Sequence, residues 1–302
     1  METEFVDWLR RRVTSSPSVP TGIGDDAAVI EVPNGVAVVT SDMLMDGTDF
    51  EMERCDRRRV GRKALAVNLS DLAAMAARPA AAIVSLAIPA RDGLEIAKEV
   101  YEGLLELAAE YHVPIAGGDT NSWSGPFAVS ITLLGNPTGR GPVRRSGAQV
   151  GDHLLVTGEF GGSILGRHFD FTPRVEEAIW IHENEELHAA IDVSDGLSLD
   201  LSRLVSASTC GAEIGTDLIP VSNAAKQLSA NDGVSPLDHA LCDGEDFELV
   251  LAVPPATAER LLAAQPLDVP LTRIGRLVSN PGLWQSTQGK TPVPLPARGY
   301  EH

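Results

Sequence analysis

Acidic residues in this chain gather at short turns beside glycine, serine or threonine, and they almost never stand singly. Most of these clusters follow an apolar segment that predicts a strand or a buried helix. Hard divalent cations prefer oxygen ligands, and Mg²⁺ is usually held by a few carboxylates together with substrate phosphates. The pattern therefore indicates an enzyme that gathers several Mg²⁺ ions around a nucleotide. Six clusters carry it: Gly24-Asp25-Asp26, Thr40-Ser41-Asp42, Asn68-Leu69-Ser70-Asp71, Gly117-Gly118-Asp119-Thr120, Asp192-Val193-Ser194-Asp195-Gly196 and Gly244-Glu245-Asp246.

Each cluster taken alone also has an ordinary structural explanation. Asp-Gly, Gly-Asp and Ser-Asp pairs are common in turns and at helix N-termini, where the side chain accepts backbone hydrogen bonds. Six clusters, several of them with two acidic residues within four positions, favour metal binding over six unrelated turns. Because metal ions and positioning supply most of the rate in phosphoryl transfer, aspartates, glycine amides and one arginine would suffice for that chemistry.

The residues that other common sites require are missing from the sequence. It contains no G-x-x-x-x-G-K-[ST] loop, no zinc spacing of cysteine and histidine, and no G-x-G-x-x-G, since Asp25 and Asp26 interrupt the candidate at Gly22. Ser194 and Asp195 have no convincing histidine partner, so a hydrolase triad has little support. The glycine-rich turn at 158–162 could meet a phosphate or could be a tight structural turn.

Composition limits the partners and the compartment. The 302 residues suit two domains of ordinary size, and a net charge of −18 without a basic stripe argues against nucleic-acid binding. We expect the basic cluster at 57–63 to be the solvated start of a helix. The acidic N-terminus shows no signal peptide, and no apolar stretch is long enough for a membrane span. Three scattered cysteines favour a reducing environment, so we expect a cytoplasmic protein. From the charge and the lack of a long apolar stretch, we expect that it binds neither nucleic acid nor membrane.

Hydrophobic periodicity predicts helices and strands that intermingle in both halves, which is an α+β chain of two mixed αβ domains. Asp56 and Asp92 are expected to cap two long helices. The periodicity lapses at 136–151, so we place the domains at 1–140 and 141–302. Helices are predicted at 3–12, 56–77, 92–111, within 163–187, at 197–208, near 221–230 and 235–240, and at 255–264; strands are predicted at 36–40, 81–88, 113–116, 127–134, 153–157, 189–193, 211–216, 247–252 and 271–277.

The acidic clusters, in this order and spacing, resemble those of the thiamine-monophosphate kinase family, over nearly the whole chain from Glu4 to Tyr300. Asn-Leu-Ser-Asp followed by Asp-x-Ser-Asp-Gly-Leu is highly specific for the superfamily of aminoimidazole ribonucleotide synthetase. The remaining matches are Lys63 to Met75, Arg145-Ser146-Gly147-Ala148 and Gly244-Glu245-Asp246-Phe247-Glu248-Leu249.

The resemblance implies ATP-dependent phosphorylation of thiamine monophosphate to thiamine diphosphate, with several Mg²⁺ ions and no covalent nucleophile. It also implies an N-terminal domain that forms a homodimer and an ATP site in the cleft between the N-terminal and C-terminal domains. Carried over by motif, the metal ligands would be Asp26, Ser41, Asp42, Asp71, Asp119, Asp192 and Asp195; ATP would contact Gly118, Asp119, Arg145 and Ser194; and the substrate would contact Glu245 and Tyr300. Asp49 is expected at the substrate end as well, from its position rather than from a matching residue.

The sequence departs from the family pattern at the substrate end. Asp49 stands where the family usually has histidine, Asp243 replaces the first glycine of Gly-Gly-Glu-Asp, and the segment from Gly162 to Asp192 is short. Asp49 could face a bound cation, or the acceptor could differ from thiamine monophosphate, or Asp49 could be a solvated turn residue. Two alternatives therefore stay open: a diverged ATP-dependent and Mg²⁺-dependent enzyme with another small acceptor, and a nucleotide-binding protein that has lost catalysis.

Overall fold

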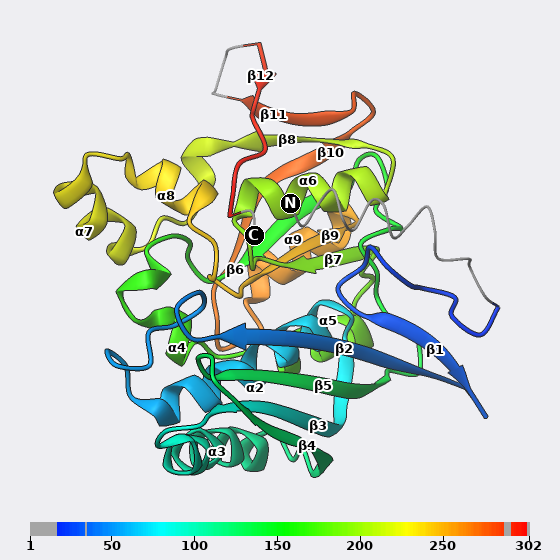
Figure 1. Cartoon of the computed structure of the whole chain (residues 1–302). Coiled ribbons are helices and arrows are strands. Elements are labelled where there is room, and N and C mark those ends of the chain that lie inside the picture. Colours follow the sequence, from blue (N-terminus) through cyan, green and yellow to red (C-terminus); the bar gives the residue numbers. More distant parts are fainter. Residues whose placement is uncertain (1–16, 34, 287–290, 301–302) are drawn as a thin grey trace.

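The computed structural model describes residues 17–33, 35–286 and 291–300, so the predicted helix at 3–12 lies outside the described residues. Two β-sheets form the framework, one in each half of the chain, and each sheet has its own helices (Figure 1). The first sheet has five strands in the order β1-β2-β5-β3-β4, and the second has seven in the order β12-β11-β8-β10-β6-β9-β7. This architecture is the α+β class of two mixed αβ domains that the sequence predicts.

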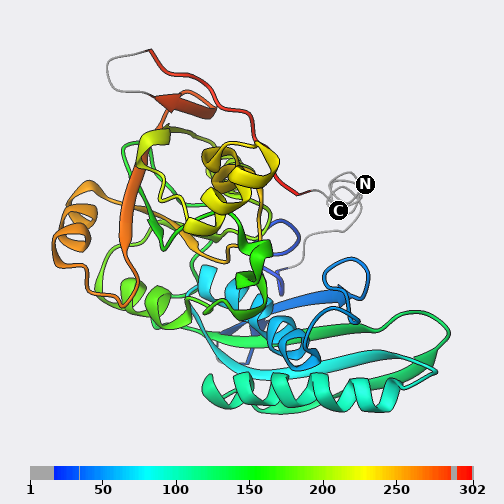
Figure 2. The ribbon, with the colours of Figure 1, turned by 90° about the vertical axis from the view of Figure 1, so that its left-hand side faces the viewer.

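The first sheet is mostly antiparallel, and only β3 and β4 pair in parallel. Buried and more exposed residues alternate along much of its central strands, so one face is buried beneath the helices α2 and α3. Figure 2 shows α3 running along the outside of this half. The elements are β1 (Ala28–Val32), β2 (Gly35–Met45), α2 (Arg57–Ala74), β3 (Ala77–Pro89), α3 (Gly93–Glu110), β4 (Ile115–Trp123) and β5 (Ala128–Pro137).

Two glycines let α2 and α3 approach each other closely. A Cβ atom on Gly61 would lie 1.7 Å from the carbonyl oxygen of Val100, and one on Gly103 would lie 1.8 Å from that of Arg58. Any side chain at either position would push the helices apart, so glycine is required there by packing. Arg57 and Arg58, at the start of α2, form ion pairs with glutamates of α3.

The second sheet is also mostly antiparallel, with β8 and β11 as its parallel pair. Strands β9 and β7 are buried throughout, as expected for strands covered on both faces. Its elements are β6 (His153–Thr157), η1 (Ser163–Leu165), α4 (Arg167–Asp170), α5 (Val175–Asn184), β7 (Ala189–Asp192), α6 (Leu197–Ala207), β8 (Gly211–Gly215), η2 (Thr216–Leu218), α7 (Asn223–Asp232), α8 (Pro236–Cys242), β9 (Leu249–Val253), α9 (Pro255–Ala264), β10 (Leu271–Val278), β11 (Gly282–Ser286) and β12 (Val293–Pro294).

Helix α2 joins the two halves, since it packs on β2 and β5 of the first sheet and also contacts α4, α5 and β7. Arg59 donates from Nε to Asp170 at 3.0 Å, and Arg62 donates to the carbonyl oxygens of Phe169 and Phe171. The expectation that the basic cluster at 57–63 is merely solvated was therefore wrong. Arg59 and Arg62, two of the five cations at 57–63, fix the segment at 169–171 of the second half, which α2 touches.

Most predicted elements are present, with ends that differ by a few residues. Asp56 caps α2 by accepting the N–H of Arg58, as predicted, whereas Asp92 occupies the N-cap of α3 in a left-handed conformation without a capping hydrogen bond. Strands β1 and β11 were not predicted.

The division at 140/141 stays a prediction; it falls between β5 and β6. In the part of the chain that the structure describes, no helix is long and apolar enough to span a membrane.

Candidate functional site

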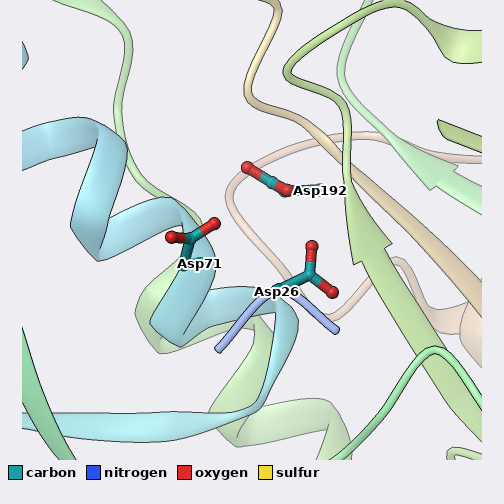
Figure 3. Close-up of side chains that lie close together, drawn as sticks. All are labelled: Asp26, Asp71 and Asp192. Atoms are coloured by element: carbon teal, nitrogen blue, oxygen red, sulfur yellow. The ribbon is translucent and has the colours of Figure 1, made fainter. Parts of the chain in front are cut away.

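Three aspartates from distant parts of the sequence converge where the two halves meet (Figure 3). Asp26 precedes β1, Asp71 lies near the end of α2, and Asp192 is the last residue of β7. Each offers a carboxylate oxygen, and these oxygens all lie within 4.8 Å of one another. Two of the carboxylates come from the first half of the chain and one from the second, so the cluster exists only when both halves are docked.

Neighbouring groups orient each of the three carboxylates. Arg145 forms a two-pronged ion pair with Asp26, with distances of 2.7 Å and 2.9 Å. Ser70 donates its hydroxyl to Asp192 at 2.6 Å, and Thr40 donates its hydroxyl to Asp71. These contacts fix the oxygens without removing their collective negative charge, because only Asp26 has a cationic partner among these contacts.

The electrostatics of the cluster are unfavourable without cations. Burial raises the pKa of Asp71 well above its usual range, and the charges of Asp42, Asp192 and Asp26 raise it further. Burial and the charge of Asp26 likewise raise the pKa of Asp192, although the hydrogen bond from Ser70 opposes this. Burial raises the pKa of Asp42 to about 6, with smaller contributions from the charges of Asp49 and Asp195. Asp42 therefore belongs to the same acidic group.

The donor set fits Mg²⁺. It consists of carboxylate oxygens from Asp26, Asp71 and Asp192 with hydroxyls alongside, and contains no sulfur or imidazole that would favour zinc. Buried like charges at this spacing repel each other, and a divalent cation among them would reverse the sign of that interaction.

Asp195 and Ser194 lie in the turn after β7, close to the cluster but with partners of their own. The guanidinium of Arg203 bridges Asp195 and Asp200, at 2.5 Å and 2.6 Å. Asp200 also accepts the backbone N–H groups of Asp195 and Gly196, which fixes the turn at the start of α6. Asp195 therefore stands at the edge of the acidic group, near enough to raise the pKa of Asp42.

Ser41 and Asp119 lie on the face of the first sheet that is turned away from α2, whereas Gly118 is in register with Val84 and, through β5, with Asp42 on the α2 side. Asp119 is in register with Ser85, which is in register with Ser130 and then with Met43. Because neighbours in register share a face, Asp119 lies with the exposed Met43 on the face opposite to α2. The hydroxyl of Ser41 contacts that of Thr132 on the same outer face. A single chain therefore does not bring Ser41 and Asp119 to the three-aspartate cluster.

Glycine is required at position 118 by packing, which the motif alone did not reveal. A Cβ atom there would lie 1.7 Å from the carbonyl oxygen of Val84 on the neighbouring strand. The turns predicted for Thr40-Ser41-Asp42 and for Gly117-Gly118-Asp119 are also wrong, because both segments lie inside strands, β2 and β4.

The residues expected at the substrate end, Asp49, Glu245 and Tyr300, are not part of the three-aspartate cluster and have contacts of their own. Asp49 is a half-buried turn residue whose carboxylate accepts the N–H of Met45 at 2.7 Å. Glu245 forms an ion pair with the fully buried Lys63 at 2.5 Å. Tyr300 is half exposed, and its backbone N–H donates to the carbonyl oxygen of Asp195 at 2.9 Å. The C-terminal segment thus runs against the turn that carries Asp195.

Several residues that shape the site were not assigned a role from the sequence. Thr40 and Ser70 stand inside the acidic clusters, but nothing in the sequence shows that they donate to Asp71 and Asp192. Asp200 carries a recognisable signal, since an acidic residue in the first turn of a helix often accepts backbone N–H groups. Lys63 stands in a basic run and opens the family-like segment from Lys63 to Met75, but neither feature assigned it a role.

Comparisons with known proteins agree with this geometry. The chain matches the family model "AIR synthase related protein, N-terminal domain" over residues 24–136 and "AIR synthase related protein, C-terminal domain" over residues 146–283. It is 48% identical to thiamine-monophosphate kinase of Rhodopirellula baltica, covering 94% of this chain and 92% of that protein. It is 32% identical to the enzyme of the same name from Bacillus subtilis, covering 100% of this chain and 99% of that one.

Solved structures show the same fold. AaThiL complexed with AMPPCP and TMP has a TM-score of 0.85 and 26% identity, covering 100% of this chain and 96% of that one. Thiamine-monophosphate kinase from Stenotrophomonas maltophilia has a TM-score of 0.73 and 33% identity, covering 92% of this chain and 94% of that one. With the family models, the full-length relatives and the fold in agreement, the chain belongs to the thiamine-monophosphate kinase family of AIR synthase related proteins.

Proposed function

We propose that this chain transfers the γ-phosphoryl group of ATP to thiamine monophosphate and releases thiamine diphosphate and ADP. The observation that carries the proposal is the three-aspartate cluster, formed by both halves of the chain, in a protein 48% identical to a thiamine-monophosphate kinase. A related structure, at 26% identity, was solved with AMPPCP and TMP, an ATP analogue and an acceptor of this kind.

The reaction needs no covalent nucleophile. An oxygen of the thiamine monophosphate phosphate attacks the γ-phosphorus of ATP, a P–O bond forms there, and the bond to the β–γ bridging oxygen breaks so that ADP leaves. Because the second pKa of a phosphate monoester is about 6, the attacking group is already ionised at neutral pH. The protein's task is therefore to position two anions and to offset their repulsion.

Several Mg²⁺ ions are part of the proposal. When bound, they neutralise charge on the phosphate oxygens. Asp26, Asp71 and Asp192 would hold them, with Asp42 beside these three and Asp195 at the edge. Arg145 is paired with Asp26 of the cluster, and it would grip ATP phosphate oxygens once the charge of Asp26 is shared with metal. Ser194, in the neighbouring turn, would contact the nucleotide as well.

The acceptor end is proposed to lie around Glu245, Asp49 and Tyr300. Glu245 and Tyr300 both contact the turn at 194–195, since the N–H of Glu245 donates to the carbonyl oxygen of Ser194 and that of Tyr300 to Asp195. A carboxylate beside an acceptor that carries a thiazolium cation would favour that cation. Asp49 contributes the second carboxylate of this end, held in place by its turn.

We also propose that two copies of the chain pair through the outer face of the first sheet. This face exposes large apolar side chains: Met43 is 60% exposed, Met45 and Ile83 are each 42% exposed, and Trp123 is 48% exposed. Exposed apolar patches of this kind usually mark interfaces. Asp119 and Ser41 lie on this face, so a second copy would enclose them and give these two motif residues a place in the site.

The dimer can be tested with charges on that face. Met43→Lys combined with Ile83→Lys places two cations in the centre of the proposed interface and should convert the protein to monomers in sedimentation velocity. Leu94→Lys on α3, where Leu94 is 63% exposed, is the matched control and should leave the assembly unchanged. A wild-type protein that sediments as a monomer, or a double variant that stays dimeric, would rule the interface out.

The reaction itself is tested by ADP release with thiamine monophosphate and with a panel of other phosphorylated and unphosphorylated acceptors, each with ATP and MgCl₂. We expect ADP and thiamine diphosphate in equal amounts with thiamine monophosphate, and at least tenfold lower kcat/KM with the other acceptors. Preference for another acceptor would instead support the diverged enzyme, and ATP binding without ADP release would support the non-catalytic alternative.

A further inference from the structure

The most deeply buried cation of the described residues is Lys63, on α2. Its side chain is 0% exposed, and its ammonium group lies 2.5 Å from the carboxylate of Glu245 and 2.9 Å from the backbone carbonyl oxygen of Asp49. It also lies 5.4 Å from the centre of the Phe169 ring, which is a cation–π distance. A buried ammonium must have its three N–H donors met, and these partners can meet them.

The partners of Lys63 come from three separate segments. Asp49 belongs to the turn after β2, Phe169 to α4, and Glu245 to the loop between α8 and β9. Two of them, Asp49 and Glu245, are the residues expected at the acceptor end of the site. A single ammonium therefore ties together, across the two halves of the chain, the two loops on which acceptor binding would depend.

Glu245 is held in an uncommon conformation. Its φ angle is +53°, in the left-handed region that non-glycine residues rarely occupy, and Phe247 follows at +51°. Such conformations are unfavourable for residues with a side chain and persist where surrounding contacts hold them. The N–H of Glu245 donates to the carbonyl oxygen of Ser194 at 2.6 Å, and Lys63 holds the side-chain end. The carboxylate is thus fixed from both ends while its side chain stays 35% exposed.

Lys63 lies eight residues before Asp71 on the same helix, which is about 12 Å along the axis. One end of α2 therefore contributes a carboxylate to the three-aspartate cluster, and the other end holds Glu245. Because its donors are engaged by Asp49, Glu245 and the aromatic ring, Lys63 is not placed to grip a phosphate itself.

We propose that Lys63 is a positioning residue for the acceptor: its ammonium fixes the Glu245 carboxylate and the Asp49 turn in the arrangement that receives the cationic end of thiamine monophosphate. The inference rests on the proposed function, in that Glu245 meets the acceptor. It predicts that losing the ammonium affects acceptor binding specifically, leaving nucleotide binding and the chemical step largely intact.

The experiment measures KM for each substrate in Lys63→Met, which keeps the length of the side chain but removes its charge. We expect KM for thiamine monophosphate to rise at least tenfold, with KM for ATP within twofold and kcat within about threefold of wild type. Lys63→Arg, which keeps the cation, should recover part of the loss. A uniform fall in kcat with unchanged KM for the acceptor would overturn the proposal.

Two control variants separate positioning from general loosening. Arg59→Met removes another cation of α2 that crosses to α4, through Asp170, but it does not touch Glu245. Lys98→Met removes an exposed lysine paired with Glu95 on α3. Neither should change KM for thiamine monophosphate by more than twofold. If Arg59→Met and Lys63→Met raise this KM equally, Lys63 acts only through the contact between the halves, and the proposal is wrong.

A double-mutant cycle with Glu245→Gln tests the pair directly. If Lys63 acts through Glu245, the double variant should have a KM for thiamine monophosphate no higher than that of the worse single variant, whereas independent roles would multiply the two increases. Glu245→Gln alters a partly exposed side chain, so it remains usable if Lys63→Met does not fold. Thermal melts without substrate provide a second readout, with non-additive losses of Tm expected.

This design keeps the two claims apart. A wild-type protein that does not phosphorylate thiamine monophosphate would remove the proposed function, and with it the acceptor role of Lys63. Normal activity with independent, multiplying effects of Lys63→Met and Glu245→Gln would leave the function in place and remove only the inference about Lys63.

Discussion

At the scale of single residues, the site is a collection of charges that oppose folding. Asp42, Asp71 and Asp192 each have a pKa raised by burial and by their neighbours, so each is held in a place where its charged form is disfavoured. Carboxyl groups with raised pKa values cluster at functional sites. They destabilise the folded state, so a protein retains them where they serve a function. Their arrangement is explained if cations complete the site.

Asp71→Asn tests that explanation through activity and stability together. The amide keeps the shape and can still accept the hydroxyl of Thr40, but it removes one negative charge from the cluster. We expect turnover to fall at least a hundredfold, which is about 2.7 kcal/mol of barrier. In EDTA, the Tm should stay the same or rise because repulsion is relieved. Near-normal turnover at modest Mg²⁺ would show that Asp71 does not serve the metal site.

Arg145→Lys tests the proposed grip on the nucleotide. A guanidinium makes two parallel hydrogen bonds, as Arg145 does with Asp26, and a lysine cannot copy that geometry. We expect KM for ATP to rise roughly tenfold, equivalent to about 1.4 kcal/mol. Arg140→Lys, an exposed arginine in the preceding loop, is the control and should behave like wild type. Equal effects of the two changes would assign Arg145 a purely structural role.

Sequence reasoning found the acidic residues of the site, but it could not tell which of them lie together in one chain. The motif residues Asp26, Asp71 and Asp192 converge as expected. The expectation was possible because carboxylates that hold one hard divalent cation must lie together. The sequence could not show that Asp119 and Ser41 lie on the opposite face of a sheet, because a one-residue change in register exchanges the faces. Lys63 stayed hidden because two of its three partners, Glu245 and Phe169, lie more than a hundred residues away along the chain.

At the scale of elements, α2 is the part on which the most depends, since its first turns hold α4 and its last turns carry Asp71. Its range was predictable from apolar periodicity and from the Asp56 cap. The extent of β2 and β4 was not, because glycine, serine and aspartate usually end strands, whereas here hydrogen bonds to β5 and β3 carry the pairing through them.

Helix α8 offers a test of pH dependence. His239 is buried, and although burial alone would lower its pKa, hydrogen bonds and charge from Asp243 and Asp232 raise it above the usual value. A raised folded-state pKa stabilises the protein fully below the unfolded value, about 6.5, and the contribution is lost as pH rises through the folded-state pKa. The Tm of His239→Gln should therefore fall further below wild type at pH 6 than at pH 8.5. An equal difference at both pH values would contradict this.

At the scale of the whole molecule, the two halves meet through charged as well as apolar contacts, such as the ion pairs of Arg59 with Asp170 and of Lys63 with Glu245. Glu248, which is fully buried, is bound by Arg174 through two bonds of 2.7 Å and by Arg167, and it anchors the segment that α2 touches. The sequence predicted two mixed domains because helical and strand periods alternate in both halves. It could not predict strand order or how the halves dock, since those depend on contacts between distant segments.

The central claim is that carboxylates from both halves of one chain hold divalent cations at a single site. The most direct measurement is anomalous diffraction from crystals of the full chain grown with Mn²⁺, a non-hydrolysable ATP analogue and thiamine monophosphate. The account predicts anomalous peaks within coordination distance of Asp26, Asp71 and Asp192, with phosphate oxygens completing the ligand shell. Fully occupied nucleotide with no peak at these three carboxylates, or with all peaks elsewhere, would contradict it.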